Sequence, residues 1–594
     1  MTSNVPDSNS IYSVLRRTYG LLNASERKRS ALMLLSIFVN SIVEILGLAV
    51  VVPVIGLVVR PETIQSNPTL KAAFDAVAPL GINTPSRFLI ALCGLMIGAF
   101  LFKALFGLAV NLFQTRFSFS VAHRLSGQMW SYHFSQSLER MRGTDSGRIL
   151  SEINTWPIQF ANAFMVGGLM MLNEISVITL IAIGLLVYNP VVFLSIAGLL
   201  GLGALVIRRA TKKRLLAYSD IRRQIEPHTN TLITNAVRGF LEVITFRASD
   251  AVREAYLKDR WTIFRLASNT SVLTLTPAKL YEVLAVVAVA GSIIIALLQG
   301  TPESGFLELL SFMAISAYRI MPSMSRLNGA VMQMRGQQYV LDAMERGALN
   351  QPKTQDRETS TSESVASVDL EVNQATLSYE ALEEPVLEQF DHSFSRGKVH
   401  AVIGPSGSGK STLISALLGL HKPEQGTVDV QLNGQNPTSL GDDLDLHDWI
   451  LHVGYLSQQP FLFQGTVRDN LTLRVPGAVL NEKLVASLIQ KLKLNDCLGG
   501  QPLEFQLHEG GSNLSGGQQQ RLALLRALQI QRPVLILDEA TSALDSELRD
   551  VVFGLLRERA QEGCNVILVT HDKELAEQCD DVLDLGTPTT STTA

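Results

Sequence analysis

The chain has 594 residues, of which 47% are hydrophobic, and its formal net charge is -4. This apolar share is high for a soluble protein, whereas the small negative charge gives no argument for a nucleic-acid partner. The four cysteines stand at positions 93, 497, 564 and 579, without the paired spacing of a zinc site or a disulfide framework.

The first half of the chain holds six apolar stretches, each long enough to form a membrane span of about 20 residues. They cover residues 31–59, 88–113, 160–188, 191–207, 271–298 and 306–324. Burial in a soluble core could explain one such stretch, but it is a poor explanation for six in succession. We therefore predict an integral membrane protein whose α-helical membrane domain, residues 31–340, contains six transmembrane helices.

The charges of the connecting loops predict the orientation of these spans. Lysine and arginine are frequent before the first stretch, in residues 16–29, and between the fourth and the fifth, in residues 208–223. The turns at residues 188–190 and 300–304 contain neither. Because basic loops remain on the cytoplasmic side, both termini and the whole second half are expected in the cytoplasm.

Several segments outside the spans have compositions that predict their roles. Residues 1–30 form a polar, cytoplasmic N-terminal segment. Residues 141–153 and 231–248 mix polar and apolar positions at helical spacing, so they are either contact segments for the second half or ordinary solvated connectors. We place a linker at 341–368, because residues 351–368 are rich in Ser, Thr and charge, and a disordered tail at 587–594.

The second half contains three motifs of nucleotide chemistry in a fixed order. Residues 404–412 read GPSGSGKST, residues 514–521 read LSGGQQQR, and residues 534–545 read VLILDEATSALD. The glycines of the first motif allow backbone N–H groups to surround phosphates, while Lys410 reaches the outer phosphates and Ser411 or Thr412 offers a hydroxyl to Mg²⁺. The apolar run 534–537 predicts a buried parallel strand that delivers Asp538 and Glu539 to its carboxyl end.

Together with GYLSQQPFLF at 454–463 and LVTHD at 568–572, these motifs resemble the nucleotide-binding domain of ABC transporters. The resemblance covers residues 369–586 and implies an α/β P-loop NTPase domain that hydrolyses ATP with Mg²⁺. In its terms Glu539 is the general base, and Gln458, His571 and Lys410 complete the catalytic set, while Ser411, Gln458 and Asp538 hold the metal. The implied nucleotide-binding residues are Tyr379, Gly404, Pro405, Ser406, Gly407, Ser408, Gly409, Lys410, Ser411, Thr412, Gln458, Ser515, Gly516, Gly517, Gln518 and Asp545.

The LSGGQ run predicts how many chains a working unit needs. Ser515 to Gly517 precede a helix whose positive end suits a γ-phosphate, and in ABC proteins that phosphate is bound to the other subunit. This chain carries one set of motifs behind one group of six spans, which is the arrangement of an ABC half-exporter. We therefore predict a homodimer with two shared ATP sites; a heterodimer with a related chain is the alternative.

Ionisable residues inside the predicted spans are candidates for a substrate path, because each costs about 2.5–3.5 kcal/mol at a helix centre. The cationic candidates are Lys103, Lys279, Arg319 and Arg326. Arg319 and Arg326 are seven residues apart and share one helical face, which predicts a basic stripe for an anionic group such as a pyrophosphate. The alternative is that these cations pair with Glu44, Glu174 and Glu282.

The membrane half also resembles the PglK-like flippases, which move lipid-linked oligosaccharides. The similar stretches are EILGLAVVVPVIGLV at 44–58, TPAKLYEVLAVV at 276–287 and YRIMPSMSRLN at 318–328. Residues 67–79 place Leu70, Phe74 and Val77 on one face and could form the short external helix of that family, or a mere amphipathic connector.

This resemblance implies translocation of a polyisoprenyl-pyrophosphate glycan to the outer leaflet of a bacterial inner membrane. The alternatives are an exporter of another lipid, a peptide or a drug, or a non-transporting ABC regulator or channel.

Overall fold

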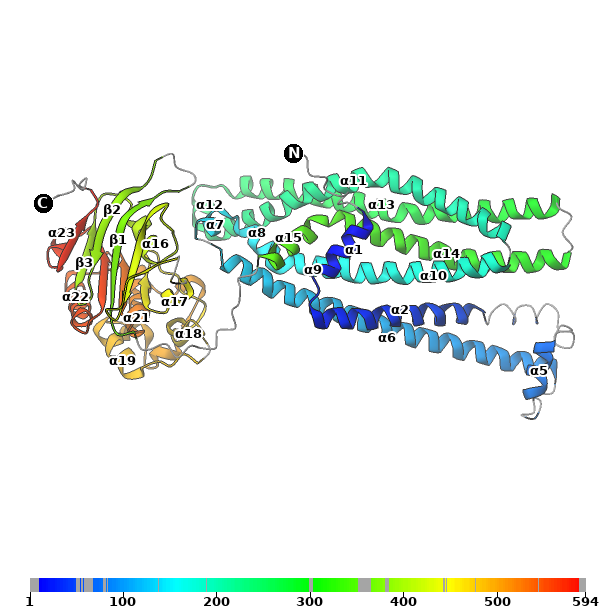
Figure 1. Cartoon of the computed structure of the whole chain (residues 1–594), viewed down its shortest axis with the longest axis horizontal. Coiled ribbons are helices and arrows are strands. Elements are labelled where there is room, and N and C mark those ends of the chain that lie inside the picture. The colour runs from blue at the N-terminus through cyan, green and yellow to red at the C-terminus, as the bar shows by residue number, and fades with distance from the viewer. Residues whose placement is uncertain are drawn as a thin grey trace. The chain divides into compact units, whose positions relative to one another are not determined.

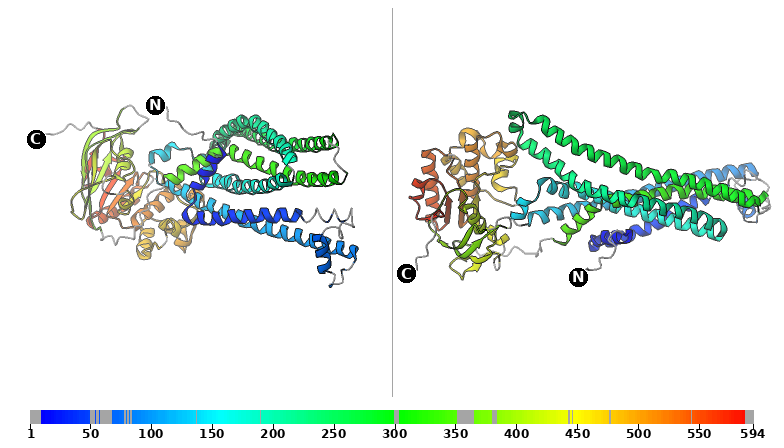
Figure 2. Two further views of the ribbon diagram at one scale, coloured as in Figure 1. Left: turned by 45° about the vertical axis from the view of Figure 1, so that its right-hand side comes forward. Right: turned by 90° about the horizontal axis from the view of Figure 1, so that it is seen from above.

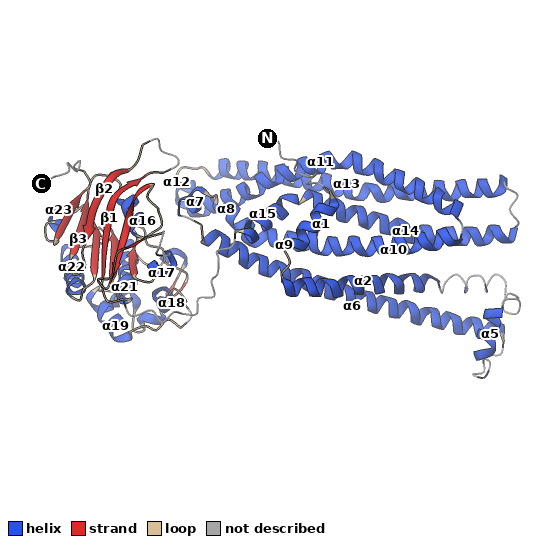
Figure 3. Ribbon diagram, viewed as in Figure 1, coloured by secondary structure: helices blue, strands red, loops and turns tan. Residues whose placement is uncertain are grey.

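The computed structural model describes residues 10–49, 54, 57, 68–77, 79, 82, 84–136, 138–188, 190–298, 303–350, 365–379, 384–441, 444, 446–475, 477–542 and 544–586. The chain divides into two compact units, one of Met1–Gln136 with Arg140–Thr354 and one of Ser137–Glu139 with Gln355–Ala594. Figure 3 shows that the described part of the first unit is helical and that the strands lie in the second. The predicted tail at 587–594 and most of the predicted linker lie outside the described residues.

Long helices that run side by side build the first unit (Figure 1). The helices are α1 (Ile11–Gly20), α2 (Ala24–Ala49), α5 (Pro68–Val77), α6 (Pro85–Phe134), α7 (Leu138–Gly143), α8 (Ser146–Leu150), η2 (Ser151–Thr155), α9 (Trp156–Phe160), η3 (Ala161–Val166), α10 (Gly167–Tyr188), α11 (Pro190–Arg238), α12 (Phe240–Thr245), α13 (Ser249–Leu298), α14 (Glu303–Gly336) and α15 (Gln338–Leu349). In both views of Figure 2, α11 and α13 are neighbours, and α14 also packs against α13 and α10.

Five of the predicted spans each fall within one helix, although the end of the first, from residue 50, is largely outside the described residues. The remaining span, 160–188, runs from the end of α9 through η3 and α10. Among the residues that the structure describes, three segments are long and apolar enough to cross a membrane: Ala24–Gly47, Pro85–Phe134 and Ser146–Gly184. The apolar side chains of the first two segments are mostly exposed in the isolated chain, as expected for surfaces that face lipid or a partner. Helices α6, α11 and α13 are far longer than a bilayer requires, because each continues into a polar extension.

The predicted helix at 67–79 is present as α5, and the face predicted to be apolar is its packing face. Leu70, Phe74 and Val77 pack around Leu57 and Phe88. The rings of Phe74 and Phe88 meet edge to face with centroids 5.3 Å apart. Proline at the first position of α6 and the Thr84 cap, which accepts a hydrogen bond from the Arg87 N–H, start the next helix immediately beyond.

The two predicted contact segments, 141–153 and 231–248, pack against each other within the first unit. Asp145 caps α8 by accepting from the Gly147 N–H, and it also accepts from the Thr231 hydroxyl of α11. A Cβ at Gly147 would lie 2.4 Å from the Pro227 carbonyl oxygen, so only glycine permits this close approach. Near it, the Asn230 amide donates to the Ser151 hydroxyl at 3.0 Å.

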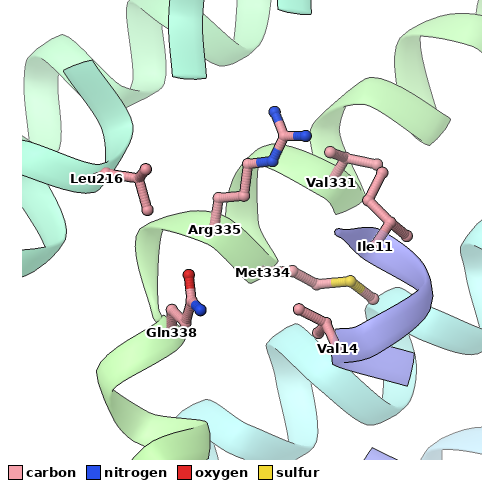
Figure 4. Close-up of a pocket in the computed structure, with 7 residues that line it drawn as sticks. All are labelled: Ile11, Val14, Leu216, Val331, Met334, Arg335 and Gln338. Carbon is pink, nitrogen blue, oxygen red and sulfur yellow. The ribbon is translucent and has the colours of Figure 1, made fainter. Parts of the chain in front are cut away.

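The structure corrects the start of the linker, which the sequence placed at residue 341. Residues up to Leu349 form α15, whose Leu341, Ala343 and Met344 are fully buried in the core of the first unit. Arg17 of α1 binds Asp342 and Glu345 of α15 at 2.6 and 2.5 Å. Figure 4 shows Val14 of α1 beside Met334 of α14, so the N-terminal segment is also part of this unit.

The second unit is an α/β domain with a five-stranded parallel sheet, order β11-β3-β10-β9-β6, and a four-stranded antiparallel sheet, order β2-β1-β4-β5. Its elements are β1 (Val368–Leu377), β2 (Leu387–Phe394), β3 (Val399–Ile403), α16 (Lys410–Leu417), β4 (Gln425–Leu432), β5 (Thr438–Ser439), α17 (Leu446–Ile450), β6 (Val453–Leu456), β7 (Gly465–Thr466), α18 (Val467–Thr472), α19 (Glu482–Lys491), α20 (Asn495–Leu498), η4 (Pro502–Glu504), β8 (Gln506–Leu507), η5 (Glu509–Gly511), α21 (Gly516–Gln529), β9 (Val534–Asp538), α22 (Ser546–Gln561), β10 (Asn565–Val569), α23 (Lys573–Ala576) and β11 (Asp581–Asp584).

Both faces of the parallel sheet are buried, as the apolar run 534–537 predicts. Leu535 and Leu537 of β9 enter one core, and Val534 and Ile536 enter the other. Helices α19, α21 and α22 therefore pack on one face of the sheet, and α16 with the antiparallel sheet packs on the other. The carboxyl edge carries the polar residues that follow β3, β6, β9 and β10.

Candidate nucleotide site and membrane charge cluster

The loop between β3 and α16 has the backbone that a phosphate-binding loop requires. Gly404, Gly407 and Gly409 have φ angles of +152°, +86° and +95°, in the region that favours glycine. A Cβ at Gly404 would lie 2.6 Å from the Ser408 hydroxyl. The sequence therefore folds here into a tight loop directly before the N-terminus of α16. The other predicted phosphate-binding residues, Pro405, Ser406, Ser411 and Thr412, lie in this loop and in the first turn of the helix.

Lys410 and Ser408 indicate that this loop fits an anion. The Lys410 ammonium donates to the carbonyl oxygens of Gly404 and Pro405 at 2.7 and 2.9 Å and, within the described residues, makes no ion pair. The Ser408 hydroxyl is buried and has no hydrogen-bond partner there. A buried cation and a buried free donor beside a helix N-terminus match the phosphates of a nucleotide.

The carboxyl ends of β9, β6 and β10 bring together Glu539, Gln458 and His571. His571 Nε2 lies 2.8 Å from one carboxylate oxygen of Glu539, and the Gln458 amide donates to the other at 3.0 Å. Glu539 has a φ of +52°, which is uncommon for a residue other than glycine, and its N–H donates to the Val569 carbonyl at 3.0 Å. The backbone thus holds this carboxylate in one position, as a general base requires.

Asp538 lies immediately before Glu539, in surroundings that suit a divalent cation. Burial and the neighbouring Glu539 carboxylate raise the pKa of Asp538 above its usual value, although Lys410 and His571 act in the opposite direction. A bound Mg²⁺ would relieve this accumulation of negative charge. Carboxylate, hydroxyl and amide oxygens of Asp538, Ser411 and Gln458 are of the type that Mg²⁺ prefers, so this donor set fits the ion.

Tyr379, two residues beyond the end of β1, lies beside the first turn of α16. Its hydroxyl lies 3.3 Å from the Thr412 hydroxyl, and its ring lies 4.8 Å from the His421 ring. The side chain is partly exposed, so an aromatic face remains for a base. His421 was not predicted as part of this site, because nothing in its local sequence distinguishes it.

Among the described residues, Ser515 and Gln518 of the LSGGQ motif form hydrogen bonds with each other rather than with the phosphate loop. Ser515 caps α21, and the Gln518 side-chain oxygen in turn accepts a hydrogen bond from the Ser515 N–H at 2.8 Å. Gly516 and Gly517 form the first turn, with their N–H groups at a positive helix end. Asp545, predicted to bind nucleotide, caps α22 by accepting from the Leu548 N–H at 2.8 Å.

One residue that the sequence did not predict connects this helix with Glu539, the candidate base. The buried Gln520 amide donates to the Glu539 backbone carbonyl at 2.7 Å. The QQQR run of the motif contains Gln520, but its helical position gave no signal of a buried contact. Movement of α21 would therefore be transmitted directly to the backbone of the candidate base.

In the membrane unit, the structure pairs the predicted cations with carboxylates. Arg319, 10% exposed at its side chain, forms an ion pair with Glu44 and lies 3.9 Å from Glu174. Arg326 binds both oxygens of Glu174, at 2.6 and 3.2 Å. Three helices, α2, α10 and α14, supply this charge cluster of Glu44, Glu174, Arg319 and Arg326. The arginines therefore do not form a free basic stripe. The structure instead has the predicted alternative, in which these cations pair with carboxylates.

The two predicted lysines differ from the arginines. Lys279 is exposed and pairs with Glu282 at 3.1 Å on its own helix, α13. The ammonium of Lys103 lies 5.3 Å from the Phe100 ring centroid, and its side chain packs beside Gly47. Within the described residues, neither lysine forms an ion pair with a member of the charge cluster.

A cavity of about 550 Å³ opens among α10, α11, α13 and α14. Arg326, which is 37% exposed at its side chain, lines it together with polar and apolar groups such as Thr270, Gln333 and Leu266. The cavity thus combines an accessible guanidinium with hydroxyl, amide and hydrocarbon surface, which suits an amphiphilic ligand that carries an anion.

The two units have the fold of an ABC exporter, a helical membrane domain followed by an ABC nucleotide-binding domain. Residues 387–542 match the family model described as ABC transporter. The fold is similar to that of a bacterial Atm1-family ABC exporter with ATP bound, at a TM-score of 0.74 over 97% of this chain and 95% of that one. Because the sequence identity is 17%, this likeness shows the fold alone.

Curated relatives match over little more than a third of this chain. The lactococcin-G-processing and transport ATP-binding protein LagD of Lactococcus lactis subsp. lactis is 34% identical over 238 residues, 39% of this chain and 32% of that protein. The ATP-dependent lipid A-core flippase of Burkholderia orbicola (strain AU 1054) is 35% identical over 219 residues, 36% of this chain and 35% of the relative. The chain thus spans about a third of the length of these relatives.

Proposed function

We propose that the chain is one half of an ATP-driven exporter that moves an anionic, lipid-linked substrate across a bacterial inner membrane. Of the substrates in this class, we favour a polyisoprenyl-pyrophosphate glycan. The proposal of this substrate class depends on one observation, the cavity in which the Arg326 guanidinium is accessible beside apolar surface. A pyrophosphate would compete with Glu174 for the Arg326 guanidinium, since both are oxyanions of matching geometry.

The proposed chemistry at the second unit is hydrolysis of ATP. When bound, Mg²⁺ supplies charge neutralisation for the phosphates, and Asp538 with Ser411 would hold it. Lys410 and the N–H groups of the loop bind and orient the phosphates, and Tyr379 offers its ring to the base. Glu539 takes a proton from the attacking water, while His571 and Gln458 hold its carboxylate in place.

The placement of Ser515 supports a working unit of two identical chains. The Ser515 cap presents N–H groups at the start of α21 but, within the described residues, makes no hydrogen bond to the loop at 404–409. We propose that it completes the ATP site of a second copy. In that arrangement both termini and both nucleotide-binding units lie in the cytoplasm, in agreement with the basic loops.

Mixing two inactive variants tests the shared site. Lys410→Ala removes the phosphate grip, and Ser515→Arg blocks the opposite half-site. Each variant alone should lose ATP hydrolysis, whereas a mixed dimer contains one site built from two intact halves and should regain a measurable part of it. If mixed dimers form, as measured by differential tagging, and no activity returns, the sites are not shared between copies.

Transport by reconstituted protein tests the substrate. Wild-type protein in liposomes should move a fluorescent polyisoprenyl-pyrophosphate glycan to the opposite leaflet only with ATP. Arg326→Gln removes a charge-assisted contact of about 1.5–3 kcal/mol, so the glycan moved per ATP hydrolysed should fall at least about tenfold.

The matched control is Arg253→Gln, which removes an exposed arginine paired with Asp250 at the start of α13. Its transport per ATP should equal that of the wild type. If another lipid, a peptide or a drug stimulates ATP hydrolysis and the glycan does not, the proposed glycan substrate is wrong and the stimulating compound takes its place. Hydrolysis that drives no transport at all would favour a regulator or a channel.

A further inference from the structure

His392, His400 and Asp581 form a cluster of metal-ligating side chains outside the nucleotide site. They come from β2, β3 and β11, so the cluster joins the antiparallel sheet to the parallel sheet. His400 and Asp581 are directly opposite each other in the pairing of β3 with β11. His400 is the second residue of β3, near its amino end. The phosphate loop follows the carboxyl end of that strand, about 13 Å further along. The two sites are therefore separate.

The hydrogen bonds of His400 require a cation between its ring and Asp581. His400 Nε2 donates its proton to the Ser395 carbonyl oxygen at 3.0 Å. The other ring nitrogen, Nδ1, lies 2.9 Å from Asp581 Oδ2. If the ring is neutral, this nitrogen carries a lone pair that faces a carboxylate oxygen. Two lone pairs at this distance repel each other, so a proton or a metal ion must lie between them.

His392 indicates a metal ion rather than a proton. Its Nε2 atom is buried and lies 3.2 Å from the same oxygen of Asp581, in an orientation that makes no hydrogen bond within the described residues. A single proton could link only one of the two rings to Asp581, whereas a metal ion would use both.

The distances suit a small tetrahedral site. The ligand atoms of the three residues lie within 4.8 Å of one another. Bonds of about 2.0–2.1 Å from zinc to nitrogen and oxygen place tetrahedral ligands about 3.3 Å apart, close to the 2.9 and 3.2 Å separations of Asp581 from the two rings. The Ser395 carbonyl fixes the tautomer of His400 in the manner usual for histidines that bind metals.

We propose that His392, His400 and Asp581 bind a divalent transition-metal ion, zinc fitting best, with a fourth position open to water. Two imidazoles and one carboxylate favour zinc over Mg²⁺ or Ca²⁺, which prefer oxygen ligands alone. Asp581 is 37% exposed at its side chain, which provides a path for entry. The ion would tie the edge strand β11 and β3 to β2 and thereby stabilise the junction of the two sheets.

Cobalt and zinc binding by the purified full-length chain tests this site. After treatment with a chelator and without nucleotide, the wild type should bind one Zn²⁺ per chain, and Zn²⁺ should raise its melting temperature. Co²⁺ should give the strong visible absorption of a four-coordinate site, which an octahedral oxygen site for Mg²⁺ does not give. Addition of one equivalent of Zn²⁺ should abolish that absorption.

His392→Ala should weaken Zn²⁺ binding at least about a hundredfold and eliminate the Zn²⁺-induced rise in melting temperature. Because His392 lies near the surface, this variant should fold, and unchanged binding of ATP verifies that it does. His508→Ala, which removes an exposed histidine elsewhere in the same unit, should behave as the wild type. Equal Co²⁺ spectra for wild type and His392→Ala, or no four-coordinate spectrum in the wild type, would overturn the proposal and leave a proton between His400 and Asp581.

Discussion

Replacement of Glu539 by glutamine is expected to leave ATP bound and to slow its hydrolysis by about two to four orders of magnitude. The amide keeps the shape of the side chain and can still meet Gln458 and His571, but it cannot take a proton from water. Because the phosphate loop does not include Glu539, affinity for ATP should change little. Phosphate release and binding of a fluorescent ATP analogue measure the two quantities separately.

The matched control for this prediction is Glu547→Gln. Glu547 is an exposed residue of α22 that pairs with Lys493 at 2.8 Å, so its loss should leave the hydrolysis rate within about twofold of the wild type. A rate in Glu539→Gln that is within a few-fold of the wild type would show that this carboxylate is not the base.

Arg319→Met is expected to destabilise the membrane unit by about 3–5 kcal/mol, because it leaves Glu44 without its partner and removes one of the two arginines near Glu174. The cost arises from a largely buried carboxylate that loses its positively charged partner. The melting temperature of the detergent-purified protein, followed by tryptophan fluorescence, should fall clearly below that of the wild type.

Removal of the matching carboxylate should rescue this variant. In Arg319→Met with Glu44→Gln, no unpaired charge remains at Glu44, while Glu174 keeps Arg326, so part of the lost stability should return. Arg253→Met, which breaks an exposed pair, should cost less than about 1 kcal/mol. Equal melting temperatures for Arg319→Met and the wild type would show that the cluster does not stabilise this unit.

Much of the nucleotide site could be predicted from the sequence, because most of its residues lie in short contiguous motifs. A glycine-rich loop needs three residues with unusual φ angles and a lysine beside them, all within 404–410. An apolar run that ends in two acids is a buried strand that delivers both to a sheet edge. The carboxylate contacts of Gln458 and His571 agree with the catalytic set that the resemblance implied, whereas their roles stay predictions.

The contacts of the membrane unit could not be predicted in the same way. Helical spacing correctly put Arg319 and Arg326 on one helix, but it could not decide whether they face a free cavity or carboxylates. That depends on Glu44 and Glu174, which α2 and α10 bring from far away in the chain. In low-dielectric surroundings a nearby carboxylate is a stronger determinant of an arginine's position than its own helix face.

By itself the sequence determined the helical stretches of the first unit, the α/β character of the second and the residues of the phosphate loop. Each depends on periodicity or on contiguous motifs. Only the tertiary structure decided that α15 belongs to the first unit, that Arg319 and Arg326 share Glu174, and that His392 and His400 converge on Asp581. His392 and Asp581 are almost two hundred positions apart in the sequence. Strand pairing and helix packing bring such residues together, and no local pattern encodes those distances.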